Sequence, residues 1–199
     1  MSKRDLIDFD GLFEEKLSEY IRMNAGKYSE KQWENIIPKL YQQFGDIYVA
    51  KAGATPKGYY AAMSDEELCG MLARHVEEGV PVSDFLCREL EARGCPDALV
   101  SLLSRRDEEI LTLAVNLAGS SPKAFPAYFD LLTGDVSEDV KEAACEQLKN
   151  NADAAKERAL LCYEAGVERE LMLEILSRCK ERDDRIYDIL IREFRTGDE

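Results

Sequence analysis

The apolar residues of this chain form a pattern that recurs about every 30 residues through its C-terminal two thirds. When residues 96–118 are aligned with residues 126–148, the apolar positions coincide. The coinciding pairs are Pro96 and Pro126, Leu99 and Phe129, Leu102 and Leu132, Ile110 and Val140, Ala114 and Ala144, and Ala118 and Leu148. Thirty-one residues further on, the same apolar positions hold Leu160, Tyr163, Leu171, Ile175 and Cys179. A repeat of this length predicts stacked supersecondary units, each too small to bury its own apolar face.

Apolar residues within each repeat follow helical spacing, so the fold class that we expect is all-α. No segment alternates apolar and polar residues for long enough to indicate a strand. Residues 1–44 are predicted to form an N-terminal helical hairpin, residues 45–63 a glycine-containing linker, and residues 64–199 the repeat array. Within the array we expect helices at about 65–78, 83–93, 96–104, 107–118, 122–133, 137–150, 153–165, 168–181 and 184–195.

The repeat at residues 126–148 resembles a HEAT repeat, whose unit is a pair of antiparallel helices. Its HEAT-like pattern consists of Pro126, Leu131, Leu132, Asp135, Val140, Lys141, Ala144 and Leu148. In the two neighbouring repeats the apolar framework is kept, but Arg105 and Leu111, or Ala165 and Met172, replace the aspartate and the basic residue. The resemblance implies an armadillo-type α-α superhelix in which the second helix of each pair lines the concave side.

Charge is distributed unevenly along the chain. The formal net charge is −14, yet residues 1–60 are neutral overall, so the remainder carries the whole excess. Such a surface repels nucleic acid and anionic lipid and attracts a basic partner, although the same excess also serves to keep a helical array soluble. The chain has no apolar run of membrane-spanning length and begins without a signal peptide, so we expect a cytoplasmic protein without membrane or nucleic-acid partners.

Residues that could perform catalysis or bind metal are scarce. The six cysteines include no CxxC pair, and His75 is the one histidine of the chain. Cys145, Cys162 and Cys179 fall on apolar helix positions, where cysteine acts as a small hydrophobe in a reducing compartment. Clusters of carboxylates lie where helices are predicted to begin, as the helix dipole favours. We therefore expect no catalytic residues, no metal and no cofactor.

The function that we expect is a non-catalytic protein-binding or scaffold module with a basic protein or peptide as its partner. A HEAT-like DNA glycosylase is an alternative that the acidic charge opposes, and a small acidic inhibitor or immunity-type protein is another. The oligomeric state stays open. If the partner does not bind the array, the aromatic-rich hairpin around Trp33 and Tyr41 is the next candidate. The array residues that we expect to contact a partner, unless they form only a solvated face, are Glu138, Lys141, Glu142, Glu146, Arg169, Glu170 and Glu174.

Overall fold

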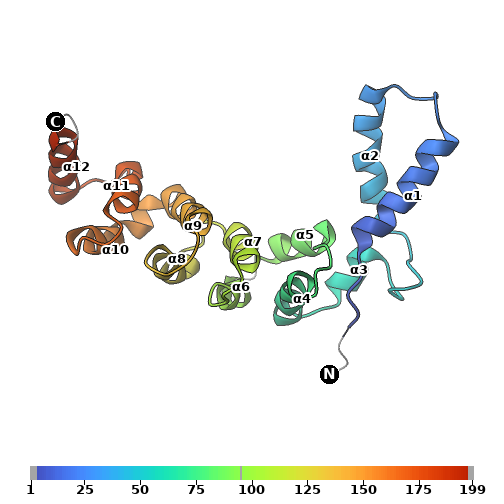
Figure 1. Ribbon diagram of the computed structural model, residues 1–199, viewed down its shortest axis with the longest axis horizontal. Helices are drawn as coiled ribbons and strands as arrows, with labels where there is room; N and C mark the ends of the chain where they lie inside the picture. The colour runs from blue at the N-terminus through green and yellow to red at the C-terminus, as the bar shows by residue number, and fades with distance from the viewer. Residues whose placement is uncertain (1–3, 95, 197–199) are drawn as a thin grey trace. The chain divides into compact units, whose positions relative to one another are not determined.

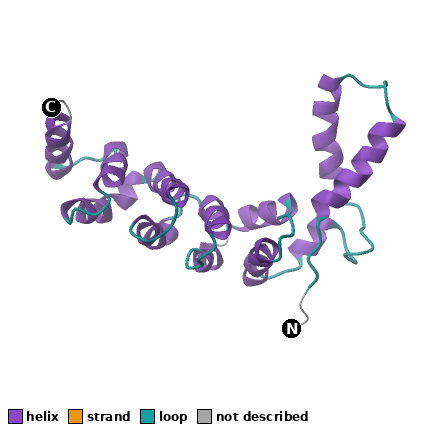
Figure 2. Cartoon of the chain, viewed as in Figure 1, coloured by secondary structure: helices purple, strands orange, loops and turns teal. Residues whose placement is uncertain are grey.

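The computed structural model describes residues 4–94 and 96–196 and is all-α, which confirms the predicted fold class. Over these residues the only pairing of β type is an isolated bridge between Val49 and Ala54, and Figure 2 shows helices and loops without a strand. The chain divides into two compact units, Met1–Cys95 (unit 1) and Pro96–Glu199 (unit 2). Residues 64–94, which we expected to belong to the repeat array, belong to unit 1 in this division.

Unit 1 begins with the expected pair of helices, α1 (Phe9–Met23) and α2 (Glu30–Phe44). The short helix α3 (Pro56–Ala61) follows, and then α4 (Asp65–Glu77) and α5 (Asp84–Arg93). Side-chain caps explain where several of these helices start. The Asp8 carboxylate accepts a hydrogen bond from the Gly11 amide, and Ser64 and Glu67 form a capping box at the start of α4.

The segment 45–63, for which we expected a linker, contains α3 and contributes to the core of unit 1. Proline at the first position of α3 and a Thr55 side chain that accepts from the Gly58 amide start this helix. Tyr59 and Tyr60 are buried and meet the ring of Phe9 edge to face, with centroid separations of 5.6 and 5.7 Å. The aromatic side chains therefore give the segment a fixed position that its glycine content does not suggest.

Unit 2 consists of stacked helix pairs and a terminal helix (Figure 1). The pairs are α6 (Pro96–Leu102) with α7 (Glu108–Ala118), α8 (Phe125–Leu132) with α9 (Glu138–Asn150), and α10 (Ala152–Glu164) with α11 (Arg169–Arg178). A single 3₁₀ turn, η1 (Pro122–Ala124), precedes α8, and α12 (Asp184–Thr196) follows the last pair. In Figure 1, α7, α9 and α11 form one row, and α6, α8 and α10 form a second.

Most of the repeating apolar positions of the sequence lie in the core between these rows, although Pro126 is exposed. Leu99, Phe129 and Leu160 from the first helices are almost completely buried. Their counterparts in the second helices include Ala114, Ala144 and Ile175, which are also buried. Ala114 and Ala144 are small and let the two helices of their pairs approach closely, and the period of about 30 residues reflects one buried layer per pair.

Carboxylates that accept hydrogen bonds from backbone amides join helices and loops of unit 2. The Glu108 carboxylate accepts from the Ser137 amide at 3.1 Å, which joins α7 to the start of α9. The Asp153 carboxylate accepts from the amides of Lys180 and Glu181 at 3.0 and 2.9 Å, which joins α10 to the loop after α11. These bonds satisfy backbone donors at loops and helix starts, where the helix itself offers no partner.

Candidate functional site

Two lysines of α9 connect this helix to α11. The Lys141 ammonium lies 3.0 Å from the Glu168 carboxylate, and the Lys149 ammonium lies 2.8 Å from that of Glu174. Each lysine side chain is only 13% exposed. Lys141 also lies 3.6 Å from Glu138, and Lys149 forms an ion pair with Glu146 on its own helix. The two lysines therefore act between the helices and do not project freely into solvent.

The charges around these lysines favour their protonated forms. The hydrogen bond from Lys141 to Glu168 raises the pKa of the lysine. Partial burial alone would lower the pKa of Lys149, but its hydrogen bonds with Glu146 and Glu174 raise it above the ordinary value. Both ammonium groups are consequently charged at neutral pH.

Glu168 supplies one of these contacts between successive helix pairs. It lies in the loop before α11 with φ of 43°, the left-handed region that side chains other than glycine seldom occupy. In this conformation its carboxylate reaches Lys141 of the preceding pair. The contact that joins the two pairs therefore uses a residue that the sequence pattern did not select.

Carboxylates lie on the solvent side of α9 and α11. Glu138, Glu142 and Glu146 are spaced by four residues, so they share one face of α9, and all three are exposed. Glu170 and Glu174 are exposed on α11. The two helices pack side by side, which brings the two rows of carboxylates into one region. We call this region the α9–α11 acidic surface, and it consists of Glu138, Glu142, Glu146, Glu170 and Glu174.

Arg169, which we expected to join this group, turns toward α12 instead. Its guanidinium donates to the Tyr163 hydroxyl and to the Glu193 carboxylate, both at 2.8 Å, and lies 4.8 Å from the centroid of the Tyr163 ring. The Tyr163 hydroxyl in turn bonds to Glu193. Arg169 thus links α11 to α10 and α12, and it does not belong to the acidic surface.

A hollow of about 450 Å³ next to Arg169 is a feature that sequence reasoning missed. Arg185 and Arg192 of α12 reach it seven residues apart, a spacing that puts them on one helix face and could have signalled it. Arg185 bonds to Glu164 at 3.0 Å and Arg169 to Glu193 at 2.8 Å, so these two positive charges are neutralised locally. The residues that line the hollow are Tyr163, Glu164, Gly166, Arg169, Arg185, Asp188, Ile189 and Arg192.

In unit 1, Tyr41 of the aromatic-rich hairpin is used for internal contacts. Its ring stacks on Phe85 with centroids 4.6 Å apart, and its hydroxyl donates to the Asp10 carboxylate at 2.6 Å. Asp10 also accepts from Ser83 and from the Asp84 amide. Burial, followed by the hydrogen bond to Asp10, raises the pKa of Tyr41. Trp33 remains partly exposed beside Tyr28 and Tyr20, so the hairpin keeps an aromatic surface near its loop.

His75 lies inside unit 1, where it is fully buried. Its Nδ1 atom is 2.8 Å from the Pro81 carbonyl oxygen and 3.3 Å from that of Val80. Burial lowers the pKa of this imidazole, which is therefore neutral at physiological pH. Within residues 4–94 and 96–196, no three side chains of the metal-binding types gather closely enough to hold an ion.

In the part of the chain that the structure describes, no helix combines the length and the apolar character needed to cross a bilayer. Comparisons of this chain with protein-family models, curated proteins and solved structures gave no match.

Proposed function

We propose that this protein is a non-catalytic, HEAT-like scaffold whose α9–α11 acidic surface binds a basic peptide or protein domain. The observation that carries this proposal is that the lysines and the glutamates of α9 lie in different surroundings. Lys141 and Lys149 are drawn between the helices by Glu168 and Glu174, while Glu138 and Glu142 remain at the solvent side. A row of carboxylates on two packed helices offers a partner's lysines or arginines several contacts in a fixed geometry.

A nucleic-acid substrate fits this surface poorly. The excess of acidic residues lies after residue 60 and would repel a nucleic acid. Few basic side chains would neutralise its phosphates, so little binding free energy would come from the release of counterions. The same charge favours a basic protein, including one that itself binds nucleic acid. The acidic surface is therefore compatible with a scaffold and with an acidic inhibitor, and the identity of the captured partner distinguishes these two functions.

Glu142 and Glu170 are the residues to test first, because both are exposed and neither is part of the lysine contacts. The test compares Glu142→Lys/Glu170→Lys with the control Glu30→Lys/Glu34→Lys. In each pair one glutamate lies in the first turn of a helix and the other further along a helix, so the change in net charge and the loss of dipole stabilisation are matched.

The probe is a fluorescent lysine-rich peptide, and anisotropy titrations at low and high salt measure its dissociation constant. Exposed charge pairs contribute up to about 1 kcal/mol each, so reversing two of them should weaken binding by about tenfold or more. The control variant should differ from the wild type by about twofold at most, because long-range charge effects are screened. Equal weakening by both variants would show that the peptide responds only to net charge and would refute the site. A pull-down from native extract at the same two salt concentrations then isolates the natural partner.

A further inference from the structure

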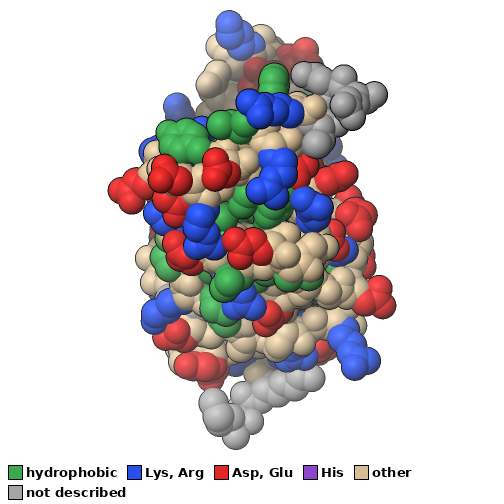
Figure 3. Space-filling model, turned by 90° about the vertical axis from the view of Figure 1, so that its left-hand side faces the viewer, with side chains coloured by type: hydrophobic (Ala, Val, Ile, Leu, Met, Phe, Trp, Pro, Cys, Tyr) green, Lys and Arg blue, Asp and Glu red, His purple; other side chains and the backbone are tan. Residues whose placement is uncertain are grey.

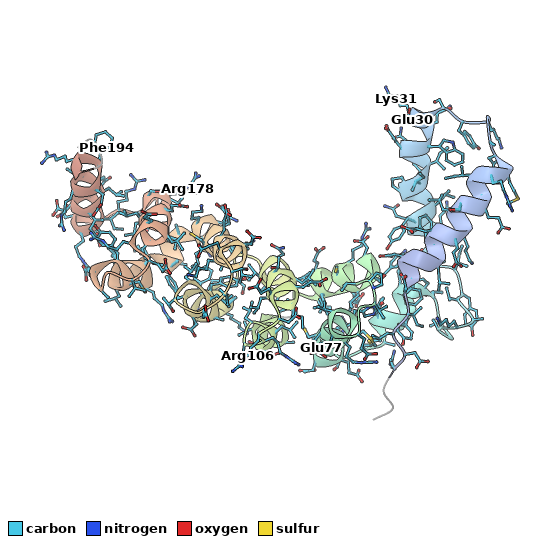
Figure 4. All side chains as sticks on the ribbon, viewed as in Figure 1. Glu30, Lys31, Glu77, Arg106, Arg178 and Phe194 are labelled. Carbon is cyan, nitrogen blue, oxygen red and sulfur yellow. The ribbon has the colours of Figure 1, made fainter. Side chains whose placement is uncertain are left out.

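Helix α12 packs in unit 2 with only part of its apolar surface covered. It contacts α11 and buries Ile186 and Ile189. Tyr187, Ile191 and Phe194 are exposed instead, by 50%, 49% and 75%. Their spacing of four and then three residues places them in one stripe along the helix. Figure 4 labels Phe194 near the C-terminal end of α12.

This α12 stripe, defined by Tyr187, Ile191 and Phe194, differs from the other exposed apolar side chains of the described residues. The others are Met23, Leu161 and Val167, which are isolated, and Ile47 and Tyr48, which are adjacent in the loop after α2. Single exposed hydrophobic residues are ordinary, but a continuous stripe marks a contact surface. Figure 3 looks onto the end of unit 2 that carries α12 and shows hydrophobic side chains among basic and acidic ones at this surface.

The charges along α12 suit an antiparallel contact with a second copy of the same helix. Asp184 and Asp188 lie in the N-terminal half, and Arg192 and Arg195 lie in the C-terminal half. With Arg185 and Glu193 included, the helix has three basic and three acidic residues and is neutral, in a chain whose net charge is −14. Two copies of the chain repel each other over most of unit 2, but not where one α12 meets another.

We propose that two copies of this chain associate through the α12 stripe, with the two helices antiparallel about a two-fold axis near Ile191. In that arrangement Ile191 meets Ile191 of the second copy. With a two-fold axis perpendicular to both helices, the same flank of each helix lies on the same side of the pair, and the two flanks run in opposite directions. Asp188 then faces Arg195 of the second copy, and the reverse pair forms on the other side of the axis.

Other arrangements fit these observations less well. A parallel pair of α12 helices would place Asp188 beside Asp188 and Arg195 beside Arg195, which is repulsive at both ends. An anionic lipid surface would meet an acidic unit with a neutral helix, so electrostatic attraction would be missing. The antiparallel pair covers the apolar stripe and satisfies the charges at the same time.

The test is the mass of the full-length protein in solution, measured by light scattering and sedimentation velocity over a range of micromolar concentrations. We expect a concentration-dependent rise toward twice the 22.5 kDa of one chain. Ile191→Asp should weaken the dimer by about thirtyfold or more, since it puts a charge at the centre of the interface. The matched control is Tyr48→Asp, which changes a side chain of similar exposure in unit 1 and should leave the dimer intact.

Charge exchange tests the antiparallel arrangement itself. Asp188→Arg and Arg195→Asp should each weaken the dimer by about tenfold, because each places like charges opposite one another. The double variant, which exchanges the two charges, should restore the wild-type dissociation constant. Each single variant should keep the wild-type circular dichroism spectrum, since both residues are exposed. A monomer at every concentration, a dimer insensitive to Ile191→Asp, or a double variant no better than the singles would each overturn the proposal.

Discussion

The contact of Lys149 with α11 should contribute measurably to the stability of unit 2, and the structure sets its size. Lys149 is 13% exposed and lies 2.8 Å from Glu174, with a second ion pair to Glu146. At that separation Coulomb's law in a water-like medium gives about 1.5 kcal/mol for one pair of unit charges. Ordering the two long side chains offsets part of this gain, which leaves roughly 0.5–1 kcal/mol per pair. Two pairs therefore contribute about 1–2 kcal/mol.

The perturbation is Lys149→Met, which keeps much of the aliphatic side chain and removes the charge. We expect the unfolding free energy to fall by about 1–2 kcal/mol and the melting temperature by about 3–6 °C for a chain of this size. Urea denaturation followed by circular dichroism measures the first quantity, and thermal denaturation the second. In high salt the difference from the wild type should shrink, because the partner carboxylates are partly exposed.

The control for this prediction is Asp130→Asn, which breaks a second ion pair between successive repeats. Asp130 bonds to Arg158 at 3.0 Å, but the two side chains are 75% and 47% exposed. We expect a loss of less than about 0.5 kcal/mol there. If Asp130→Asn costs as much as Lys149→Met, or if Lys149→Met costs nothing, then the partial burial of Lys149 does not strengthen its ion pairs and the reasoning is wrong.

Three further predictions concern the core and the helix ends. Burial lowers the pKa of His75 below its unfolded value of about 6.5, so the unfolded chain takes up a proton at a higher pH than the folded chain does. The unfolding free energy should therefore decrease as the pH falls below about 6.5. In urea titrations between pH 5.5 and 7.5, His75→Gln should abolish this pH dependence, since no other histidine is present. Tyr128→Phe should cost about 1–1.5 kcal/mol in the same assay, because the buried hydroxyl donates to the carbonyls of Gly119 and Val115 at 2.7 and 3.2 Å; an unchanged midpoint would contradict this. Neither Gly94→Ala nor Gly70→Ala adds a methyl group that meets another atom, so the two variants differ only in backbone conformation. Gly94→Ala should destabilise the protein by about 1 kcal/mol, because Gly94 is a C-cap with φ of 56°, whereas Gly70→Ala inside α4 should stabilise it by about 0.5–1 kcal/mol. Two shifts of the same sign would refute the conformational argument.

The fold could be predicted from the sequence to the extent that it depends on apolar periodicity. Positions such as Leu132 and Val140 are buried because a helix pair must cover its apolar stripe, and the spacing of these residues states where the stripe lies. The helix α3 was not predicted, since glycine and proline dominate the segment around it. Its position depends on contacts of Tyr59 and Tyr60 with Phe9, more than 40 residues earlier in the chain, and local pattern does not contain that information.

The candidate site could be predicted only in part, for a related reason. Glu138 and Glu142 were expected at the solvent side of α9, and they are exposed. Lys141 was assigned to the same group, yet it faces α11. The wheel of a single helix shows which face is apolar, but it does not show which polar flank a neighbouring helix covers. The contacts of Arg169 and Glu168 could not be predicted for the same reason, because they depend on how one helix pair is offset against the next.

The stacking of pairs in unit 2 has a consequence for how the unit loses structure. Its strongest contacts join α6 to α7, α8 to α9 and α10 to α11, and each second helix to the next. Cooperativity is therefore passed from neighbour to neighbour, as in a one-dimensional chain of coupled elements. Amide hydrogen exchange should accordingly show a gradient, with α12 opening most often and α9, which is coupled on both sides, protected longest. A partner that bridges α9 and α11 would add a coupling between two elements and slow exchange in both, including amides that it never touches.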